Sequence, residues 1–150
     1  INNEIGKNVP KIDFEKERGM IYSIIDCIQN NLLLSCHDIS DGGLAVAIAE
    51  MALGGEADGT IGAEINLNFS NLRNDKILFS ESSGFVFEAD KKNINKIKNI
   101  FKKYKINIIE IGKTINDKKL MISKNNKIII ELEIEKLRQA WTTGFADAIK

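Results

Sequence analysis

A strongly apolar stretch, residues 44–53, restricts what this chain can fold into. Glu50 is the only charged residue in this stretch. If the stretch forms a helix, apolar side chains lie on nearly every face of that helix. Such a helix has to be buried on several sides, so other elements must pack around it. An apolar run at residues 32–34 precedes it and predicts a buried strand over 32–39. We therefore expect a strand, a polar turn and a buried helix in succession.

The turn between that strand and that helix concentrates polar groups. Residues 35–43 contain one histidine, two carboxylates, two serines and two glycines. The first N–H groups of a helix lack intrahelical partners, and Gly42 and Gly43 would let a phosphate approach the backbone closely. The carboxylates of Asp38 and Asp41 repel a bare phosphate. A divalent cation such as Mg²⁺ would remove this repulsion by binding both carboxylate and phosphate oxygens. Local chemistry favours a plainer interpretation, in which Asp41 is an N-cap and the glycines form a tight turn.

A second polar stretch interrupts two apolar runs at residues 78–87. Residues 80–83 carry one carboxylate, Glu81, and three hydroxyl groups directly before a strand predicted at 85–89. This stretch is either a ligand loop or a polar connection between elements, and local evidence leaves both open.

At 150 residues the chain suits a single domain, which we place at residues 13–150, with residues 1–12 as a linker or edge segment. Four isoleucines at spacings of three and four (Ile21, Ile24, Ile25, Ile28) share one face of the first helix. We expect helices capped by Asp13 and Asp90, strands at 61–67 and 106–112, a hairpin of 119–123 and 127–133 around Asn125 and Asn126, and a last helix from Ile134. The strands at 85–89 and 106–112 flank a helix and predict a strand–helix–strand unit.

Composition excludes several classes of protein. Lysine plus arginine and aspartate plus glutamate both total 21, so no basic excess indicates a nucleic-acid partner. No apolar stretch is long enough for a membrane span, and no secretory signal is present. Two cysteines fit a reducing cytoplasm. Because Ile1 rather than methionine stands first, we expect a fragment or a processed chain.

We assign no catalytic residue. His37 is the only histidine, and a strand-end histidine that is satisfied by neighbouring polar groups is the commoner case. No serine–histidine–aspartate set is apparent, and neither cysteine has a metal-ligand spacing.

Several motifs together resemble one family. Residues 35–47 resemble the Ala-His-Asp-x-Ser-Asp-Gly-Gly-Leu motif of phosphoribosylformylglycinamidine synthase, and residues 78–82 resemble its Leu-Phe-Ser-Glu-Ser element. Residues 111–113 with 120–122 are similar to its Ile-Gly-x-Val strand pair, and residues 9–13 and 137–141 fit as well. The resemblance covers nearly the whole chain and is strongest to the C-terminal domain of the second copy of a unit that the synthetase contains twice.

The resemblance implies a fold and an activity. The fold is the α+β C-terminal domain of the aminoimidazole ribonucleotide synthetase-like type, a mixed sheet with a ferredoxin-like strand–helix–strand core and packed helices. The activity is that of an ATP-dependent carbon–nitrogen ligase of purine biosynthesis, which converts formylglycinamide ribonucleotide to the amidine with glutamine-derived ammonia. The implied cofactors of the complete enzyme are Mg²⁺ and ATP or ADP. Implied partners are an N-terminal ATP-binding domain, a glutaminase and a small accessory subunit, and this domain alone would be inactive.

The resemblance also implies site residues. It makes Asp38 a ligand of Mg²⁺ and places Glu81 and Ser82 at the substrate or nucleotide, beside the phosphate-approach positions Gly42 and Gly43. Members of the family usually carry an arginine close to where this chain has Gly84. The absence of that arginine here weakens the case for phosphate binding by this loop. The family's catalytic histidine lies in the N-terminal half, so that role does not pass to His37.

Two alternatives stay open. The chain is similar to the C-terminal halves of related enzymes, namely aminoimidazole ribonucleotide synthetase, thiamine-monophosphate kinase and the hydrogenase maturation factor, although Gly42 and Gly43 argue against the kinase. The other alternative is a structural scaffold domain without ligand, which an exposed apolar patch and no carboxylate cluster would favour.

Overall fold

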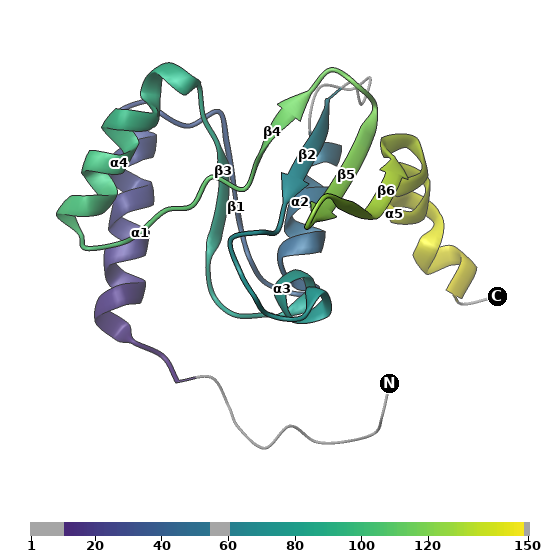
Figure 1. The fold of residues 1–150 in the computed structure, drawn as a ribbon, viewed down its shortest axis with the longest axis horizontal. Coiled ribbons are helices and arrows are strands. Elements are labelled where there is room, and N and C mark those ends of the chain that lie inside the picture. The colour runs from purple at the N-terminus through teal and green to yellow at the C-terminus, as the bar shows by residue number, and fades with distance from the viewer. Residues whose placement is uncertain (1–10, 55–60, 149–150) are drawn as a thin grey trace. The chain divides into compact units, whose positions relative to one another are not determined.

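The computed structural model describes residues 11–54 and 61–148, in a chain that divides into two compact units (Figure 1). One unit consists of Ile1–Leu34 and Ala89–Ile108, and the other of Ser35–Glu88 and Ile109–Lys150. Most of the predicted linker, residues 1–10, lies outside the described residues. No helix in the described ranges is long and apolar enough to cross a membrane.

The first unit contains two packed helices. They are α1 (Phe14–Gln29) and α4 (Ile94–Lys103), the second of which follows a 3-10 turn, η1 (Lys91–Asn93). A Cβ atom added at Gly19 of α1 would lie 3.0 Å from the carbonyl oxygen of Tyr104, so glycine allows a close approach here. Small and apolar residues form the buried side of α1: Gly19, Ser23, Ile24 and Cys27. Of the four isoleucines predicted to share a face, only Ile24 is buried.

Both predicted helix caps of this unit occupy cap positions, but only one is a hydrogen-bonded cap. Asp13 Oδ1 accepts a hydrogen bond from the N–H group of Lys16 at 3.2 Å, which confirms the first cap. Asp90 precedes η1, yet its side chain makes no capping hydrogen bond. Its carboxylate instead lies 3.1 Å from the Nζ atom of Lys92.

The second unit contains a two-stranded and a four-stranded sheet. In the small sheet, β1 (Ser35–Asp38) pairs antiparallel with β3 (Phe85–Glu88). The larger sheet has the order β4-β2-β5-β6, in which β2 runs parallel to β5 and the other neighbours are antiparallel. This mixed sheet and its helices confirm the predicted α+β class. The remaining elements are β2 (Gly62–Asn66), β4 (Gly112–Ile115), β5 (Lys119–Lys124), β6 (Lys127–Glu133), α2 (Gly43–Leu53), α3 (Asn74–Phe79) and α5 (Ile134–Ala148).

Helix α2 lies at the core of the second unit, as its apolar sequence predicts. None of its residues is exposed, and its buried side packs with α3, α5 and the larger sheet. Burial of this kind supplies most of the free energy that holds a domain together. The buried cluster consists of Leu44, Ile48, Ala52, Ala63, Ile65, Leu67, Leu78, Leu120, Ile122 and Ile134.

Two strand predictions were wrong in their bounds. The first strand does not span 32–39: Leu34 is exposed, and β1 begins only at Ser35. Residues 106–111 form no strand, and in the described chain they meet a strand through one backbone hydrogen bond, which the N–H group of Asn66 donates to Ile111 O at 2.7 Å. The strand after α4 starts at Gly112, and β3 and β4 join different sheets. The two strands of the predicted strand–helix–strand unit therefore do not belong to one sheet.

The predicted hairpin and last helix are confirmed. Strands β5 and β6 meet at Asn125 and Asn126, whose φ angles of 50° and 61° suit the mirror-image turn that favours hairpins. Helix α5 follows β6 directly and buries Ile134 at its first position.

Candidate functional site

The two polar stretches of the sequence meet at one end of the small sheet. Antiparallel pairing sets Asp38, at the end of β1, opposite Phe85, at the start of β3. The N–H group of Ile39 then donates to the carbonyl oxygen of Gly84 at 2.8 Å. The turn that leads into α2 and the loop that leads into β3 are therefore neighbours, although about forty residues separate them in the sequence.

Two glycines shape the turn into α2. Gly42 has φ 78° and ψ 0°, the values of the third residue of a type II turn, and the N–H group of Gly43 closes that turn on Ser40 O at 2.9 Å. Gly43 also has a positive φ, 69°. A Cβ atom at Gly43 would lie 2.7 Å from the carbonyl oxygen of Leu78, in α3. Side chains are thus excluded at both positions, by φ and by the closeness of other atoms.

A carboxylate from the second stretch lies at the start of α2. Glu81 Oε1 accepts a hydrogen bond from the N–H group of Gly42 at 3.1 Å. The N-terminal end of a helix carries partial positive charge, so this carboxylate is favourably placed. The predicted capping role of Asp41 is wrong: Gly42 occupies the N-cap position, and no side chain of that residue can cap. The N–H group of Gly42 instead donates to Glu81, which comes from a loop distant in the sequence.

Asp38 presents an accessible carboxylate beside this turn. Its side chain is 62% exposed, and Asp38 Oδ1 lies 3.6 Å from His37 Nδ1. Alternation along β1 leaves Asp38 exposed and His37 half-buried. Asp38 is the one predicted metal ligand, and the described residues hold no group of three or more histidine, cysteine, aspartate or glutamate side chains that could bind a metal ion.

His37 is satisfied by protein groups, as predicted. Its Nε2 atom lies 3.0 Å from Glu50 Oε2, and its Nδ1 atom lies 2.6 Å from the carbonyl oxygen of Asp38. The single charge on α2 thus faces the single histidine. Sequence reasoning missed this role of Glu50, although a lone carboxylate on an otherwise apolar helix signals a specific partner.

Ser82 does not reach the turn. Its hydroxyl oxygen lies 2.9 Å from that of Ser80, and both residues are exposed. Within the described ranges, no hydrogen bond joins Ser82 to Asp38 or to Gly42. The structure therefore joins Gly42 to Glu81 by a hydrogen bond, with Gly43 next in the same turn and Asp38 at the end of the preceding strand, and leaves Ser82 outside this contact.

Cys36 provides a chemical probe of Asp38. The pKa of the Cys36 thiol is raised, because partial burial disfavours the thiolate and the charge of Asp38 adds to the effect. The substitution Asp38→Asn is expected to lower this pKa and to speed alkylation of Cys36 by iodoacetamide at mildly alkaline pH, since the thiolate is the reactive form. Peptide mass spectrometry measures the rate, while the fully buried Cys27 should stay unmodified. Asp41→Asn is the matched control, and equal rates for Asp38→Asn and the unsubstituted chain would contradict the prediction.

Comparison with known proteins gives one consistent set of relatives. A family model described as "AIR synthase related protein, C-terminal domain" matches residues 1–124. The chain is 35% identical over 145 residues to the phosphoribosylformylglycinamidine synthase subunit PurL of Methanothrix thermoacetophila, an alignment that covers 97% of this chain and 18% of that relative. It is also 35% identical over 147 residues to PurL of Methanocaldococcus jannaschii, with coverage of 96% and 19%. The chain thus spans about a fifth of the length of these relatives.

Solved structures share this fold. The structure of PurLQS from Thermotoga maritima superposes with a TM-score of 0.74 at 19% identity, covering 86% of this chain and 22% of that chain. T. maritima PurL complexed with ATP superposes with a TM-score of 0.73 at 20% identity, covering 86% and 23%. At such identities the likeness concerns the fold alone.

Proposed function

Because the chain belongs to the family of AIR synthase related protein C-terminal domains, we propose that it is the C-terminal domain of a phosphoribosylformylglycinamidine synthase. Relatives of that name are 35% identical to it over nearly its whole length. One observation carries the proposal: the hydrogen bond from Gly42 to Glu81 joins, at one site, the two motifs that most resemble that synthase.

The proposed reaction forms a carbon–nitrogen bond at the expense of ATP. The amide oxygen of formylglycinamide ribonucleotide accepts a phosphoryl group, and ammonia derived from glutamine then displaces phosphate to give the amidine. Two solved structures of T. maritima PurL, one complexed with ATP and the other with FGAR, support the choice of these substrates. The domain would supply one wall of a nucleotide or substrate site, with an N-terminal ATP-binding domain opposite. A glutaminase and a small accessory subunit are the further proposed partners.

Asp38 is the proposed ligand of Mg²⁺. Mg²⁺ is usually held by one or two carboxylates together with substrate phosphates and water, so it does not need a cluster of protein ligands. The exposed carboxylate of Asp38 fits such a site. When bound, the ion neutralises phosphate charge and thereby resolves the repulsion between Asp38 and an anionic substrate.

Glu81 is proposed to hold the turn ready for a ligand. Two donors of the turn are already used, since the N–H group of Gly42 donates to Glu81 and that of Gly43 donates to Ser40. A phosphate that reaches the N–H group of Gly42 must therefore displace the Glu81 carboxylate. Ser82, which follows Glu81 in the same loop, is proposed to contact the ligand through its hydroxyl group.

Calorimetric titration with ATP tests the proposal. We would titrate the 150-residue chain and a longer protein that includes the preceding N-terminal domain, each with Mg²⁺ and with EDTA. Saturable binding that needs Mg²⁺ is expected at least in the longer protein, because phosphate and metal bind together. Binding to the chain alone would mean that the domain holds the nucleotide without its neighbour. Absence of binding to both proteins would contradict the proposal.

A scaffold role without ligand is the second candidate. It is favoured by exposed apolar side chains on α1, among them Phe14, Ile21 and Ile28, and by the lack of a metal-binding cluster in the described ranges. A longer protein that assembles with its glutaminase but keeps full activity with Asp38→Asn and Glu81→Gln combined would establish this alternative.

A further inference from the structure

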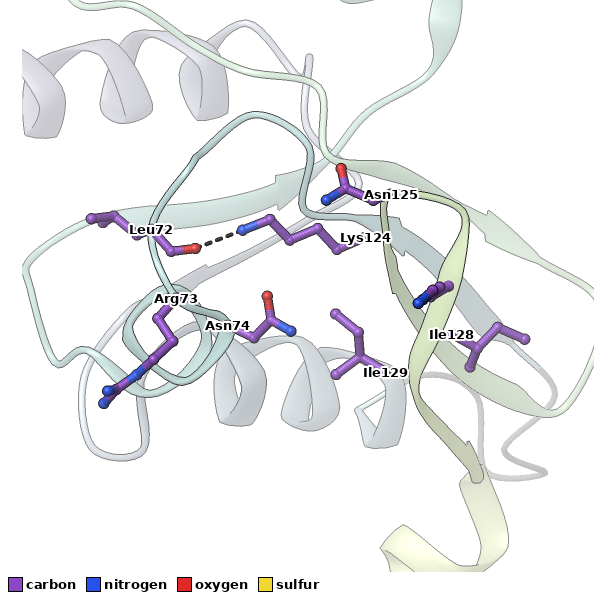
Figure 2. Close-up of a pocket in the computed structure, with 8 residues that line it drawn as sticks. Leu72, Arg73, Asn74, Lys124, Asn125, Ile128 and Ile129 are labelled. Atoms are coloured by element: carbon purple, nitrogen blue, oxygen red, sulfur yellow. Dashed lines mark hydrogen bonds between the residues drawn. The ribbon is translucent and has the colours of Figure 1, made fainter.

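A hollow lies at the start of α3, at the opposite end of that helix from the turn of Gly42 and Gly43. It has a volume of about 550 Å³, which is within the range of small-molecule sites. Figure 2 shows that its walls come from α3 and its preceding loop on one side and from the β5–β6 hairpin on the other. The lining residues are Leu72, Arg73, Asn74, Lys124, Asn125, Lys127, Ile128 and Ile129.

The hollow concentrates positive charge that the chain leaves uncompensated. Lys124 and Lys127 are direct cross-strand partners in the hairpin, and like charges in that position destabilise a sheet. The Nζ atom of Lys124 lies 2.6 Å from the carbonyl oxygen of Leu72, a contact that leaves its charge in place (Figure 2). No ion pair involves Lys124 or Lys127 in the described ranges. Of the three cations, only Arg73 faces a carboxylate, that of Asp75, through bonds of 2.6 and 2.7 Å.

Another lysine of the same hairpin does have carboxylate partners, unlike Lys124 and Lys127. Lys119, at the other end of β5, lies 2.9 Å from Glu131 and 3.4 Å from Glu133 of β6. A like-charge pair kept at the turn, beside a hollow, is a local conflict of the kind that functional sites retain. An anion bound between the two ammonium groups would remove the repulsion.

Uncharged groups complete the site. Asn74 and Asn125 add amide groups to the lining, and Figure 2 shows the Asn74 side chain beside Ile129. Ile129 adds apolar surface that is partly exposed beside these groups. Cations next to partly exposed apolar surface suit a ligand that carries an anionic group on an apolar or planar body.

We propose that this hollow binds a phosphorylated small molecule, with its phosphate held by Lys124 and Lys127 and its body beside Asn74 and Ile129. Lys124 uses one N–H group on Leu72 and keeps two for phosphate oxygens. The site does not rest on the proposed function, because none of its residues belongs to the turn of Asp38, Gly42 and Glu81.

Nuclear magnetic resonance of the ¹⁵N-labelled 150-residue chain tests this, with phenyl phosphate as the probe and phenol as its uncharged counterpart. Phenyl phosphate is expected to shift the backbone amide signals of Asn74, Asn125 and Ile128 in a saturable way, and to bind at least about tenfold more tightly than phenol. The double substitution Lys124→Gln and Lys127→Gln is expected to weaken binding by about tenfold or more. Lys96→Gln with Lys98→Gln on α4 removes the same charge from exposed positions outside the hollow and should leave the affinity unchanged.

A second variant keeps the test independent of folding. Lys127→Glu places opposite charges across the hairpin and should therefore raise the midpoint of thermal unfolding while abolishing phenyl phosphate binding. Three results would overturn the proposal. They are no shift at the three amides, equal weakening by the α4 control, and shifts caused by a glutamate-rich peptide but not by phenyl phosphate, which would indicate a protein contact instead.

Discussion

Replacing Gly43 with alanine is expected to lower the free energy of unfolding by roughly 3 kcal/mol. The positive φ of Gly43 strains any residue with a Cβ atom, and this Cβ would lie 2.9 Å from the Cα atom of Phe79. Because the obstructing atoms belong to the backbone, α2 and α3 would have to move apart. Urea denaturation followed by circular dichroism measures the change.

Gly54→Ala is the matched control, at the other end of the same helix. Gly54 has φ −74°, and an added Cβ would lie 3.4 Å from the carbonyl oxygen of Glu50, which is ordinary van der Waals contact. Its effect should stay within about 1 kcal/mol, because alanine adopts this backbone conformation without strain. A loss below about 1 kcal/mol for Gly43→Ala as well would show that the turn adapts and that glycine is not required there.

Asp38→Asn is expected to weaken Mg²⁺-dependent ATP binding by about tenfold or more in the protein that binds it, since even outer-shell groups of metal sites have effects of this size. Asparagine keeps the shape of the side chain and removes its charge, so the fold should remain. Calorimetry with Mg²⁺ measures the affinity. The residual affinity in EDTA should be equal in both proteins.

Asp41→Asn is the control for Asp38, because it removes an exposed carboxylate from the same turn. It should leave the affinity nearly unchanged, since Asp41 neither caps α2 nor is a proposed ligand. If the two substitutions weaken binding equally, the effect is a general one of charge and the assignment of Asp38 fails.

The sequence predicted elements that depend on local chemistry. The buried helix α2 follows from ten residues with one charge, and the β5–β6 hairpin follows from Asn125 and Asn126, which tolerate positive φ. It predicted the wrong cap for α2, because Asp41 has the right residue type while the actual acceptor, Glu81, comes from a loop about forty residues away. No local pattern reports such a contact.

The strand wrongly predicted at 106–112 has a similar cause. Its apolar residues suit a strand, but a strand also needs a neighbour, and the neighbour is set by topology. Only Ile111 comes close to strand pairing, by accepting a hydrogen bond from the N–H group of Asn66 at 2.7 Å. The contact of Gly42 with Glu81 likewise depends on the register of β1 and β3, which sequence periodicity does not contain.

The strand order β4-β2-β5-β6 has a consequence for biosynthesis. Strand β2 is central, yet both of its neighbours follow it by some fifty residues along the chain. While the ribosome makes the intervening segment, Ala63 and Ile65 have no sheet to join, and loop closure over this distance delays pairing further. A nascent chain that stalls before Gly112 therefore leaves both edges of β2 unpaired and Ala63 and Ile65 uncovered, which favours aggregation or chaperone binding.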